Sequence, residues 1–449
     1  MSDTVEPILL TSSAPPLQRE TTVGNYFVSN YPPFSFWKAE SLPDFQAALD
    51  REPRAGVPLG IYTHIPFCRK RCHFCYFRVY TDKDSAAIKS YLDAVLRELS
   101  LYASRPFIGG RKPGFVYFGG GTPSYLSVEQ LRFLSDGMKR QLSWDEVEEV
   151  TFECEPGTLT DHKLKAIREM GVTRLSLGIE NFDDHILEIN GRAHRSLEIG
   201  RAYRYAREIG FPQINIDLIA GMVEETDENW RECIRKTVEM SPDSVTVYQM
   251  EIPFNTTLYK QMRAEGKLVA PVADWDTKRR WVDEAFTELE RAGYTVASAY
   301  TAVKSKEQTR FVYRDQLWAG ADLLSLGVAS FGHIGGTHYQ NHHDFDPYIA
   351  ALNSGQLPVY RALTPTEEEW YIREFILQLK LGSVSADYFA EKFGIDPREQ
   401  FAGPLGTLKE WGYLTQNGDR IGITRAGLLQ VDRLLHEFFR PEHRGVRYA

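Results

Sequence analysis

Between residues 60 and 296, short runs of apolar and β-branched residues alternate with longer segments whose apolar residues recur at helical spacing. The short runs are typical of buried strands, and the longer segments are typical of amphipathic helices. Their alternation predicts βαβ units that build a parallel sheet. We expect six strands, at Gly60–His64, Gly114–Phe118, Val150–Cys154, Arg174–Leu177, Gln213–Ile219 and Ser244–Gln249.

The helical segments lie between and after these strands. They are Ala86–Ser104, Val128–Arg140, Thr160–Met170, Ser196–Ile209, Asp227–Met240 and Trp275–Ala292. Because parallel strands need right-handed crossovers, six such units with helices outside predict a partial (βα)6 parallel barrel of the α/β class. Loops at the carboxyl ends of its strands are the expected place for chemistry.

The barrel is expected to occupy residues 56–300, with other segments on either side. Residues 1–55 are predicted to be an extended segment, because Gly24–Trp37 is dense in aromatic residues and proline. This segment either packs on the outside of the barrel or forms a flap over its mouth. Residues 301–363 are expected to be a connection that covers the barrel.

A helical, winged-helix-like domain is predicted for residues 364–449. Its helices are expected at Glu367–Leu381, Ala386–Phe393 and Leu405–Trp411. They precede a hairpin at Leu414–Thr424 that turns on Asn417-Gly418, and a last helix follows. The acidic balance of the chain favours a packing role for this domain over DNA binding.

Composition narrows the class of protein. A chain of 449 residues, 43% hydrophobic and 25% charged, is typical of a soluble globular protein. Its five cysteines, an odd number, do not form a disulfide framework and suit a reducing cytosol. No signal peptide or long apolar run is apparent, so we expect a cytoplasmic protein without a membrane span. The net charge of -9 argues against a broad nucleic-acid footprint.

The cysteines Cys68, Cys72 and Cys75 carry the strongest chemical signal, and they follow the first predicted strand. Three thiolates in a tight loop suit a [4Fe-4S] cluster and leave one iron open for another ligand. Structural zinc is the rival, with His64 or His73 as a further ligand, although no second ligand pair closes a tetrahedron. Reactive or bystander thiols are a further alternative.

Polar and glycine residues follow the later strands. Gly119-Gly-Gly-Thr122 would let backbone groups approach the amino and carboxylate groups of an amino-acid cofactor. Three carboxylates and an arginine near successive strand ends would suit a cationic sulfonium and its ammonium group. They are Glu153, Glu180, Asp217 and Arg192. For Asp217, a structural salt bridge is the alternative.

The cysteine loop, Gly119–Pro123 and Asn215–Gly221 together resemble the radical S-adenosylmethionine (SAM) superfamily in its HemN-type branch. Further similarity lies at Asn30–Pro32, Ala321–Val328 and His338–Asn341, so the resemblance covers most of the chain. It implies a [4Fe-4S] cluster held by the three cysteines and SAM held by Tyr62, Gly120 and Glu153. For members that bind a second SAM, it implies Phe74, Gly121, Thr122, Glu180, Arg192 and Asp217, with Glu251 and Phe331 aligned less securely.

The resemblance also implies a substrate class. A tetrapyrrole is expected, with oxidative decarboxylation of its propionates to vinyl groups, and an electron donor such as flavodoxin or ferredoxin. Cations around the cluster loop could bind the propionates. They are Arg69, Lys70, Arg71 and Arg78.

Two positions depart from coproporphyrinogen dehydrogenases, which carry a fourth cysteine where this chain has Phe77 and a glutamine where it has Glu180. Phe77 resembles the haem chaperone, haem-degrading and methyltransferase members. Methyl transfer with two SAM molecules is therefore one alternative function. A haem-binding chaperone is another, with haem iron bound in the histidine-rich segment 332–343.

Overall fold

A computed structural model describes residues 26–265 and 272–446, which form two compact units. The larger unit comprises residues 37–296 and 300–364. The smaller unit joins residues 26–36 and 297–299 to the C-terminal residues from 365 onward. Residues 1–25 of the expected N-terminal segment lie outside the described part of the chain.

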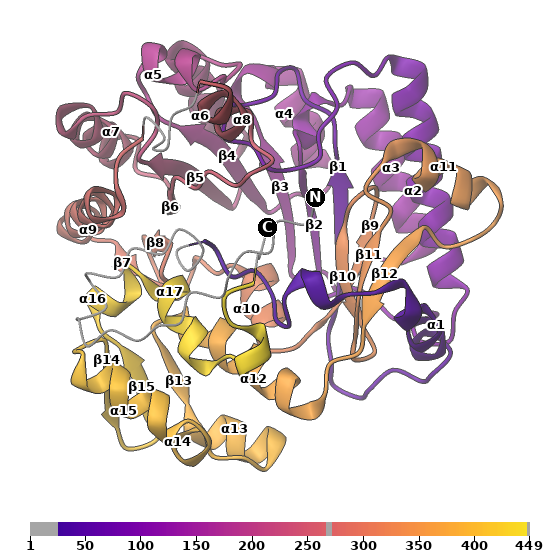
Figure 1. Ribbon diagram of the computed structural model, residues 1–449. Helices are drawn as coiled ribbons and strands as arrows, with labels where there is room; N and C mark the ends of the chain where they lie inside the picture. Colours follow the sequence, from indigo (N-terminus) through magenta and orange to yellow (C-terminus); the bar gives the residue numbers. More distant parts are fainter. Residues whose placement is uncertain (1–25, 266–271, 447–449) are drawn as a thin grey trace. The chain divides into compact units, whose positions relative to one another are not determined.

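The larger unit is built on a 12-stranded sheet in the order β12-β11-β10-β9-β1-β2-β3-β4-β5-β6-β8-β7 (Figure 1). Strands β9 and β1 to β6 run parallel, and the strands beyond them on both sides are antiparallel. The predicted α/β fold is confirmed, and all six predicted strands are present. The strands are β1 (Leu59–Ile65), β2 (Phe115–Gly120), β3 (Glu149–Cys154), β4 (Arg174–Glu180), β5 (Gln213–Ala220), β6 (Ser244–Gln249), β7 (Thr295–Val296), β8 (Thr301–Val303), β9 (Asp322–Leu326), β10 (Phe331–Ile334), β11 (Thr337–Asn341) and β12 (Val359–Leu363).

Helices connect the parallel strands and pack on one another in chain order, α2 on α3, α3 on α4, α4 on α6 and α7 on α9. Several begin at capping side chains that the sequence supplies. Ser127 and Gln130 form a capping box at α3, and Thr226 caps α7. These helices are α2 (Ser85–Ala103), α3 (Val128–Gln141), α4 (Asp161–Glu169), α5 (Asp184–Ile189), α6 (Ser196–Ile209), α7 (Asp227–Met240), α8 (Thr257–Ala264) and α9 (Trp275–Arg291).

The segment expected to cover the barrel, residues 301–363, adds strands to both edges of the sheet. Strand β8 pairs with β6, while β9 pairs with β1 and continues into β10, β11 and β12. Between them lies α10 (Val312–Trp318), and α11 (Phe345–Asn353) precedes β12. Glu149 at the amino end of β3 accepts the N–H groups of Val312 and Tyr313 at 3.0 and 3.2 Å. These hydrogen bonds fix helix α10 at the amino ends of the strands. A functional site is therefore expected at the opposite, carboxyl ends.

The N-terminal segment is not extended throughout, because it contains α1 (Leu42–Leu49). Pro43 lies in the first turn of this helix, and Phe45 and Leu49 are fully buried. The helix therefore has a suitable start and an apolar face to bury, and it lies beyond the aromatic- and proline-rich residues 24–37 from which extended chain was predicted for the whole segment.

The smaller unit contains a three-stranded antiparallel sheet in the order β13-β15-β14. Its helix, strand, helices and hairpin follow the order of a winged helix. The predicted hairpin is present, but its turn is Gly418-Asp419, one residue later than expected, because Asn417 still pairs with Arg420. The elements are α12 (Glu367–Leu379), β13 (Ser383–Ser385), α13 (Ala386–Phe393), α14 (Pro397–Gln400), α15 (Ala402–Glu410), β14 (Leu414–Asn417), β15 (Arg420–Ile423), α16 (Arg425–Leu428) and α17 (Val431–Leu435).

Residues 26–36 pack within this smaller unit. The N–H of Val28 and the buried Lys380 ammonium both donate to Asp432 at 2.8 Å. Lys380 also donates to the carbonyl of Val28 at 2.7 Å, and Tyr31 contacts His443 through its hydroxyl at 2.7 Å. The two ends of the described chain are therefore tied together. No helix in residues 26–265 and 272–446 is long and apolar enough to span a membrane.

Candidate functional site

The cysteine loop begins where β1 ends, at the carboxyl edge of the parallel strands. Its backbone is anchored at several points. The N–H of Cys68 donates to Tyr80 at 3.0 Å, and the N–H of His73 donates to Asn190 at 3.0 Å. The N–H of Thr122, in the loop after β2, donates to Phe67 at 2.9 Å. The loop is thereby held against the ends of its neighbouring strands.

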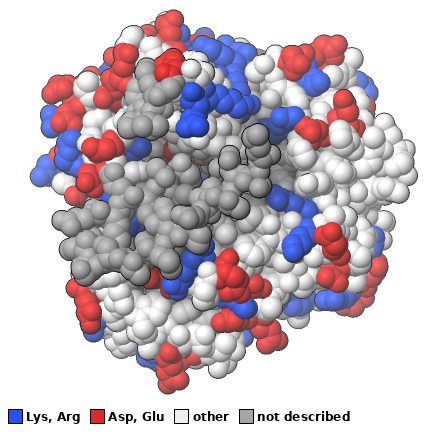
Figure 2. Space-filling model, in the orientation of Figure 1, with Lys and Arg blue, Asp and Glu red and all other residues white. Residues whose placement is uncertain are grey.

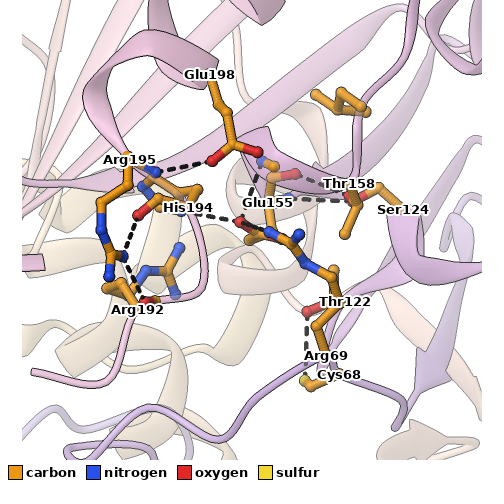
Figure 3. A network of polar contacts seen from close by, with 12 residues as sticks. Cys68, Arg69, Thr122, Ser124, Glu155, Thr158, Arg192, His194, Arg195 and Glu198 are labelled. Carbon is orange, nitrogen blue, oxygen red and sulfur yellow. Dashed lines mark hydrogen bonds and ion pairs between the residues drawn. The ribbon is translucent and has the colours of Figure 1, made fainter. Parts of the chain in front are cut away.

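Side chains from two other loops donate hydrogen bonds to the thiols. Thr122 Oγ1 lies 3.3 Å from Cys68 Sγ (Figure 3). Arg192 Nη1 lies 3.3 Å from Cys72 Sγ. Burial raises the pKa of Cys68 to about 11 and that of Cys75 to about 12. A metal centre that binds these sulfurs must therefore displace their protons.

None of the three cysteines forms a disulfide. The nearby Cys72 sulfur contributes to the raised pKa values of both Cys68 and Cys75. Each histidine considered as a further zinc ligand has its Nδ1 atom engaged elsewhere. His64 Nδ1 contacts the Tyr62 hydroxyl at 3.1 Å, and His73 Nδ1 contacts the Ile189 carbonyl at 2.9 Å. Across residues 26–265 and 272–446, no three His, Cys, Asp or Glu side chains form a group that could hold a metal ion. The donor chemistry fits a cuboidal cluster, whose thiolates bind separate irons.

The glycines after β2 allow close approach at this edge. Gly120 adopts a φ of 111°, and a Cβ there would lie 2.5 Å from the His64 ring. A Cβ at Gly121 would lie 3.0 Å from Cys68 Sγ and 2.9 Å from the carbonyl oxygen of Ile65. Larger residues would therefore push against the cysteine loop, which explains the glycine pair.

Glu153 lies on β3 with both carboxylate oxygens hydrogen-bonded. Its Oε1 accepts from the Tyr117 hydroxyl at 2.5 Å, and its Oε2 accepts from the Gly120 N–H at 3.1 Å. Burial raises its pKa to about 7, and the charge of Asp217 adds to the increase. This carboxylate would gain from a nearby positive charge.

Glu180 ends β4 in a left-handed conformation with a φ of 67°, which is strained for a residue with a side chain. Its Oε1 lies 3.5 Å from Arg192 Nη2, and that nitrogen also donates to the Gly178 carbonyl at 2.5 Å. Burial raises the pKa of Glu180 to about 7, against the opposing effect of Arg192. Arg192 also has a buried Nε without a hydrogen-bond partner, a donor that a ligand could use.

Asp217 lies on β5, where Ser176 and Asn215 donate to its two oxygens at 2.8 and 2.9 Å. Burial raises its pKa, and Arg174 opposes this effect. Its charge in turn raises the pKa values of Glu153 and Glu180. The structure thus brings the three predicted carboxylates into one electrostatically coupled group.

The other predicted residues have different neighbours. Tyr62 lies on β1, opposite Tyr117 of β2, with ring centroids 5.8 Å apart. Phe74 packs beside the cluster of Ile186, Met222 and Met250. Glu251 follows β6, and Phe331 begins β10 at a centroid distance of 5.6 Å from Trp37.

Sequence reasoning missed three neighbours of the site, Tyr117, Glu155 and His194. Tyr117 and Glu153 are hydrogen-bonded, and Glu155 accepts from His194 Nδ1 at 3.0 Å. Residues two apart on a strand share a face. Because Tyr117 lies two residues before Gly119, the sequence could have placed it on the same face of the strand as the glycine loop. The pairing of Glu155 with His194 depends on a distant loop and gives no such signal.

Charges are mixed over the surface. On the face in Figure 2, acidic and basic side chains are interspersed across the described residues. Two loop cations are paired with carboxylates, Arg69 with Glu155 and Arg78 with Asp344.

Comparisons with known proteins agree with this geometry. Residues 62–237 match the radical SAM superfamily, and residues 366–429 match the HemN C-terminal domain. The heme chaperone HemW of Bacillus subtilis is 30% identical over 383 residues, which cover 84% of this chain and 98% of the relative. An oxygen-independent coproporphyrinogen III oxidase of Synechocystis sp. is 26% identical and 91% of each chain is covered.

Among solved structures, coproporphyrinogen III oxidase (HemN) from Escherichia coli, described as a radical SAM enzyme, superimposes with a TM-score of 0.80. It is 23% identical, and the match covers 92% of this chain and 96% of that one, which shows a shared fold. The chain therefore belongs to the radical SAM superfamily, in its HemN-type branch, whose cofactors are a [4Fe-4S] cluster and SAM.

Proposed function

We propose that this protein is a radical SAM oxidoreductase that acts on a tetrapyrrole, by oxidative decarboxylation of propionate side chains to vinyl groups. The observation that carries this proposal is the similarity to a coproporphyrinogen oxidase over 91% of both chains, barrel and C-terminal region included. When bound and reduced, the cluster and SAM would supply radical chemistry that removes one hydrogen atom from a propionate side chain; loss of carbon dioxide and of one further electron to an electron acceptor would then leave the vinyl group.

In this proposal, Cys68, Cys72 and Cys75 hold the cluster, which receives its electron from a donor such as flavodoxin or ferredoxin. Tyr62, Gly120 and Glu153 hold SAM. The negative carboxylate of Glu153 would attract the positive charges of SAM. Hydrogen bonds from Tyr117 and Gly120 hold its two oxygens in place. A second SAM would contact residues among Phe74, Gly121, Thr122, Glu180, Arg192, Asp217, Glu251 and Phe331.

Exposed aromatic side chains beside the cysteine loop favour a flat, apolar substrate. Tyr76 and Phe77 lie with their ring centroids 4.7 Å apart, and Phe77 is 45% exposed. Phe254 is also exposed. Exposed aromatic rings next to one another are suited to stacking on a macrocycle. Lys70 is an exposed cation of the loop that could bind a propionate, whereas Arg69 already pairs with Glu155.

The test is anaerobic turnover of the reconstituted protein with coproporphyrinogen III, SAM and a reductant. We expect release of carbon dioxide and a mass loss in the tetrapyrrole that matches conversion of a propionate to a vinyl group. SAM consumption with this substrate but without carbon dioxide would contradict the proposal.

Methyl transfer is a second candidate, which the exposed Phe77 favours because it stands where coproporphyrinogen dehydrogenases carry a further cysteine. Methyl-labelled SAM distinguishes the two reactions. Label in the tetrapyrrole product would identify methyl transfer, and its absence would eliminate it.

The relative named heme chaperone HemW provides a third possibility. In the histidine-rich segment, however, His333 and His338 are buried and their Nδ1 atoms face one another at 2.7 Å. Their Nδ1 atoms therefore engage each other, which leaves these two nitrogens unavailable to haem iron. An absorption titration with haem tests this alternative, and a Soret shift that saturates at one haem per chain would support it.

A further inference from the structure

Glu155 is the first residue after β3, and several donors meet its buried carboxylate. Its Oε1 accepts from Arg69 Nη2 at 3.0 Å, from His194 Nδ1 at 3.0 Å and from the Gly157 N–H at 3.1 Å (Figure 3). Its side chain is 10% exposed. Burial opposes ionisation, but His194, Arg192 and Arg69 outweigh it and lower the pKa of Glu155 to about 2. Glu155 is thus a charged anchor at the strand end.

The backbone of this anchor is itself fixed. The Glu155 N–H donates to Ser124 Oγ at 3.1 Å, and Thr158 Oγ1 donates to the Glu155 carbonyl at 2.8 Å. The hydroxyls of Ser124 and Thr158 lie 2.6 Å apart. Because its main chain is held by two neighbouring loops, the carboxylate can position the groups that bind it.

One of these groups belongs to the cysteine loop. Arg69 directly follows Cys68, and its Nη2 contacts both oxygens of Glu155, at 3.0 and 3.1 Å. An ion pair between exposed groups contributes little, but a buried carboxylate that loses its partner is costly. The contact therefore joins the segment between Cys68 and Cys72 to the end of β3.

A second partner of Glu155, His194, lies close in sequence to a residue that contacts Cys72. His194 places its Nε2 3.1 Å from the Ile179 carbonyl of β4, so both ring nitrogens face acceptors. Two residues earlier, Arg192 donates to Cys72 Sγ. By fixing His194, Glu155 also fixes the backbone that carries this donor. Hydrogen bonds to the sulfur ligands of a cluster influence its reduction potential and its retention.

We propose that Glu155 is a positioning residue for the cluster, which holds the cysteine loop through Arg69 and the N–H···S donor Arg192 through His194. This inference rests on the proposed assignment of Cys68, Cys72 and Cys75 as cluster ligands.

The test compares wild type with Glu155→Gln after anaerobic reconstitution, by potentiometric titration monitored by electron paramagnetic resonance. Loss of a negative charge alone would raise the reduction potential. Release of the Arg192 hydrogen bond would lower the potential. We expect the second effect to dominate, so that the reduction potential of Glu155→Gln lies below that of wild type. An unchanged or higher potential overturns the proposal.

Cluster loss to an iron chelator gives a second readout. We expect Glu155→Gln and Arg69→Gln to lose iron roughly tenfold faster than wild type. Arg69→Gln keeps the test valid if the first variant fails to fold. The matched control is Glu149→Gln, because Glu149 is also a buried carboxylate that accepts from three groups, Val312, Tyr313 and Thr151, but at the opposite end of β3.

Equal acceleration in Glu149→Gln would show a general loss of stability and overturn the inference. So would wild-type rates in both loop variants. If wild type itself binds no [4Fe-4S] cluster by Mössbauer spectroscopy, the proposed function fails instead, so the two failures are distinguishable.

Discussion

At the scale of single residues, Glu153 should make SAM binding depend on pH. Its pKa is raised to about 7, mainly by burial, so the carboxylate is largely protonated below that pH. Because a cationic ligand prefers the ionised form, we expect SAM affinity to increase as pH rises through 7 and to fall up to tenfold per unit below it. Equilibrium binding of SAM to the oxidised, reconstituted protein, which does not cleave it, measures this dependence.

The substitution Glu153→Gln should weaken SAM binding at pH 8 by about tenfold to a hundredfold, the range for a lost hydrogen bond to a charged group. It should also flatten the pH profile. Glu149→Gln is the matched control, since Glu149 is buried on the same strand but binds α10 at the opposite end. A profile that persists in Glu153→Gln would assign the titration to another group.

Functional residues can be recognised from sequence when they lie close together along the chain. Cys68, Cys72 and Cys75 share one loop, and Gly120 and Gly121 share one turn, so spacing alone indicates their chemistry. Glu155 carries no such signal. Its partners Arg69 and His194 lie 86 and 39 residues away, and the pairing of the parallel strands from β1 to β4 brings them together.

At the scale of elements, Glu98 joins helix α2 to the late strands of the sheet. Its oxygens accept from the Gly327 N–H at 2.8 Å, from Asn341 at 2.7 Å and from Tyr348 at 2.6 Å. Burial raises its pKa from 4.5 to about 7. The folded state therefore binds more protons than the unfolded state between these values, and stability contributed by this group falls as pH rises through the interval.

We expect this loss to reach about 3 kcal/mol above pH 7. Glu98→Gln cannot titrate, so its free energy of unfolding relative to wild type should increase between pH 5 and 8. Urea unfolding of both proteins at several pH values measures the difference. A constant difference would mean that Glu98 stays ionised when folded.

Strands β1 to β6 could be predicted because each is a short apolar run bounded by a helix of clear periodicity. The strands after residue 300 could not, for a physical reason. Strand β9 pairs with β1, whose residues lie more than 250 positions earlier, for example Leu323 with Gly60. Nothing local distinguishes such a strand from a buried connection.

At the scale of the whole chain, the N-terminal segment should be needed by the smaller unit. Val28 and Tyr31 contact Asp432 and His443 within it. We expect a protein that lacks residues 1–36 to lose protease resistance in residues 365–446, while one that lacks only residues 1–25 keeps it. Limited proteolysis with mass spectrometry measures both. Equal resistance of the two truncations would show that residues 26–36 contribute nothing to this unit.

The position of β9 beside β1 has a consequence for biosynthesis. Until Asp322–Leu326 leaves the ribosome, β1 has a neighbour on only one side, and its outer edge is open to wrong pairing. The cysteines follow directly from that half-paired strand. We therefore expect stable metal binding only after most of the chain has been translated, when β9 has paired with β1 next to the cysteine loop.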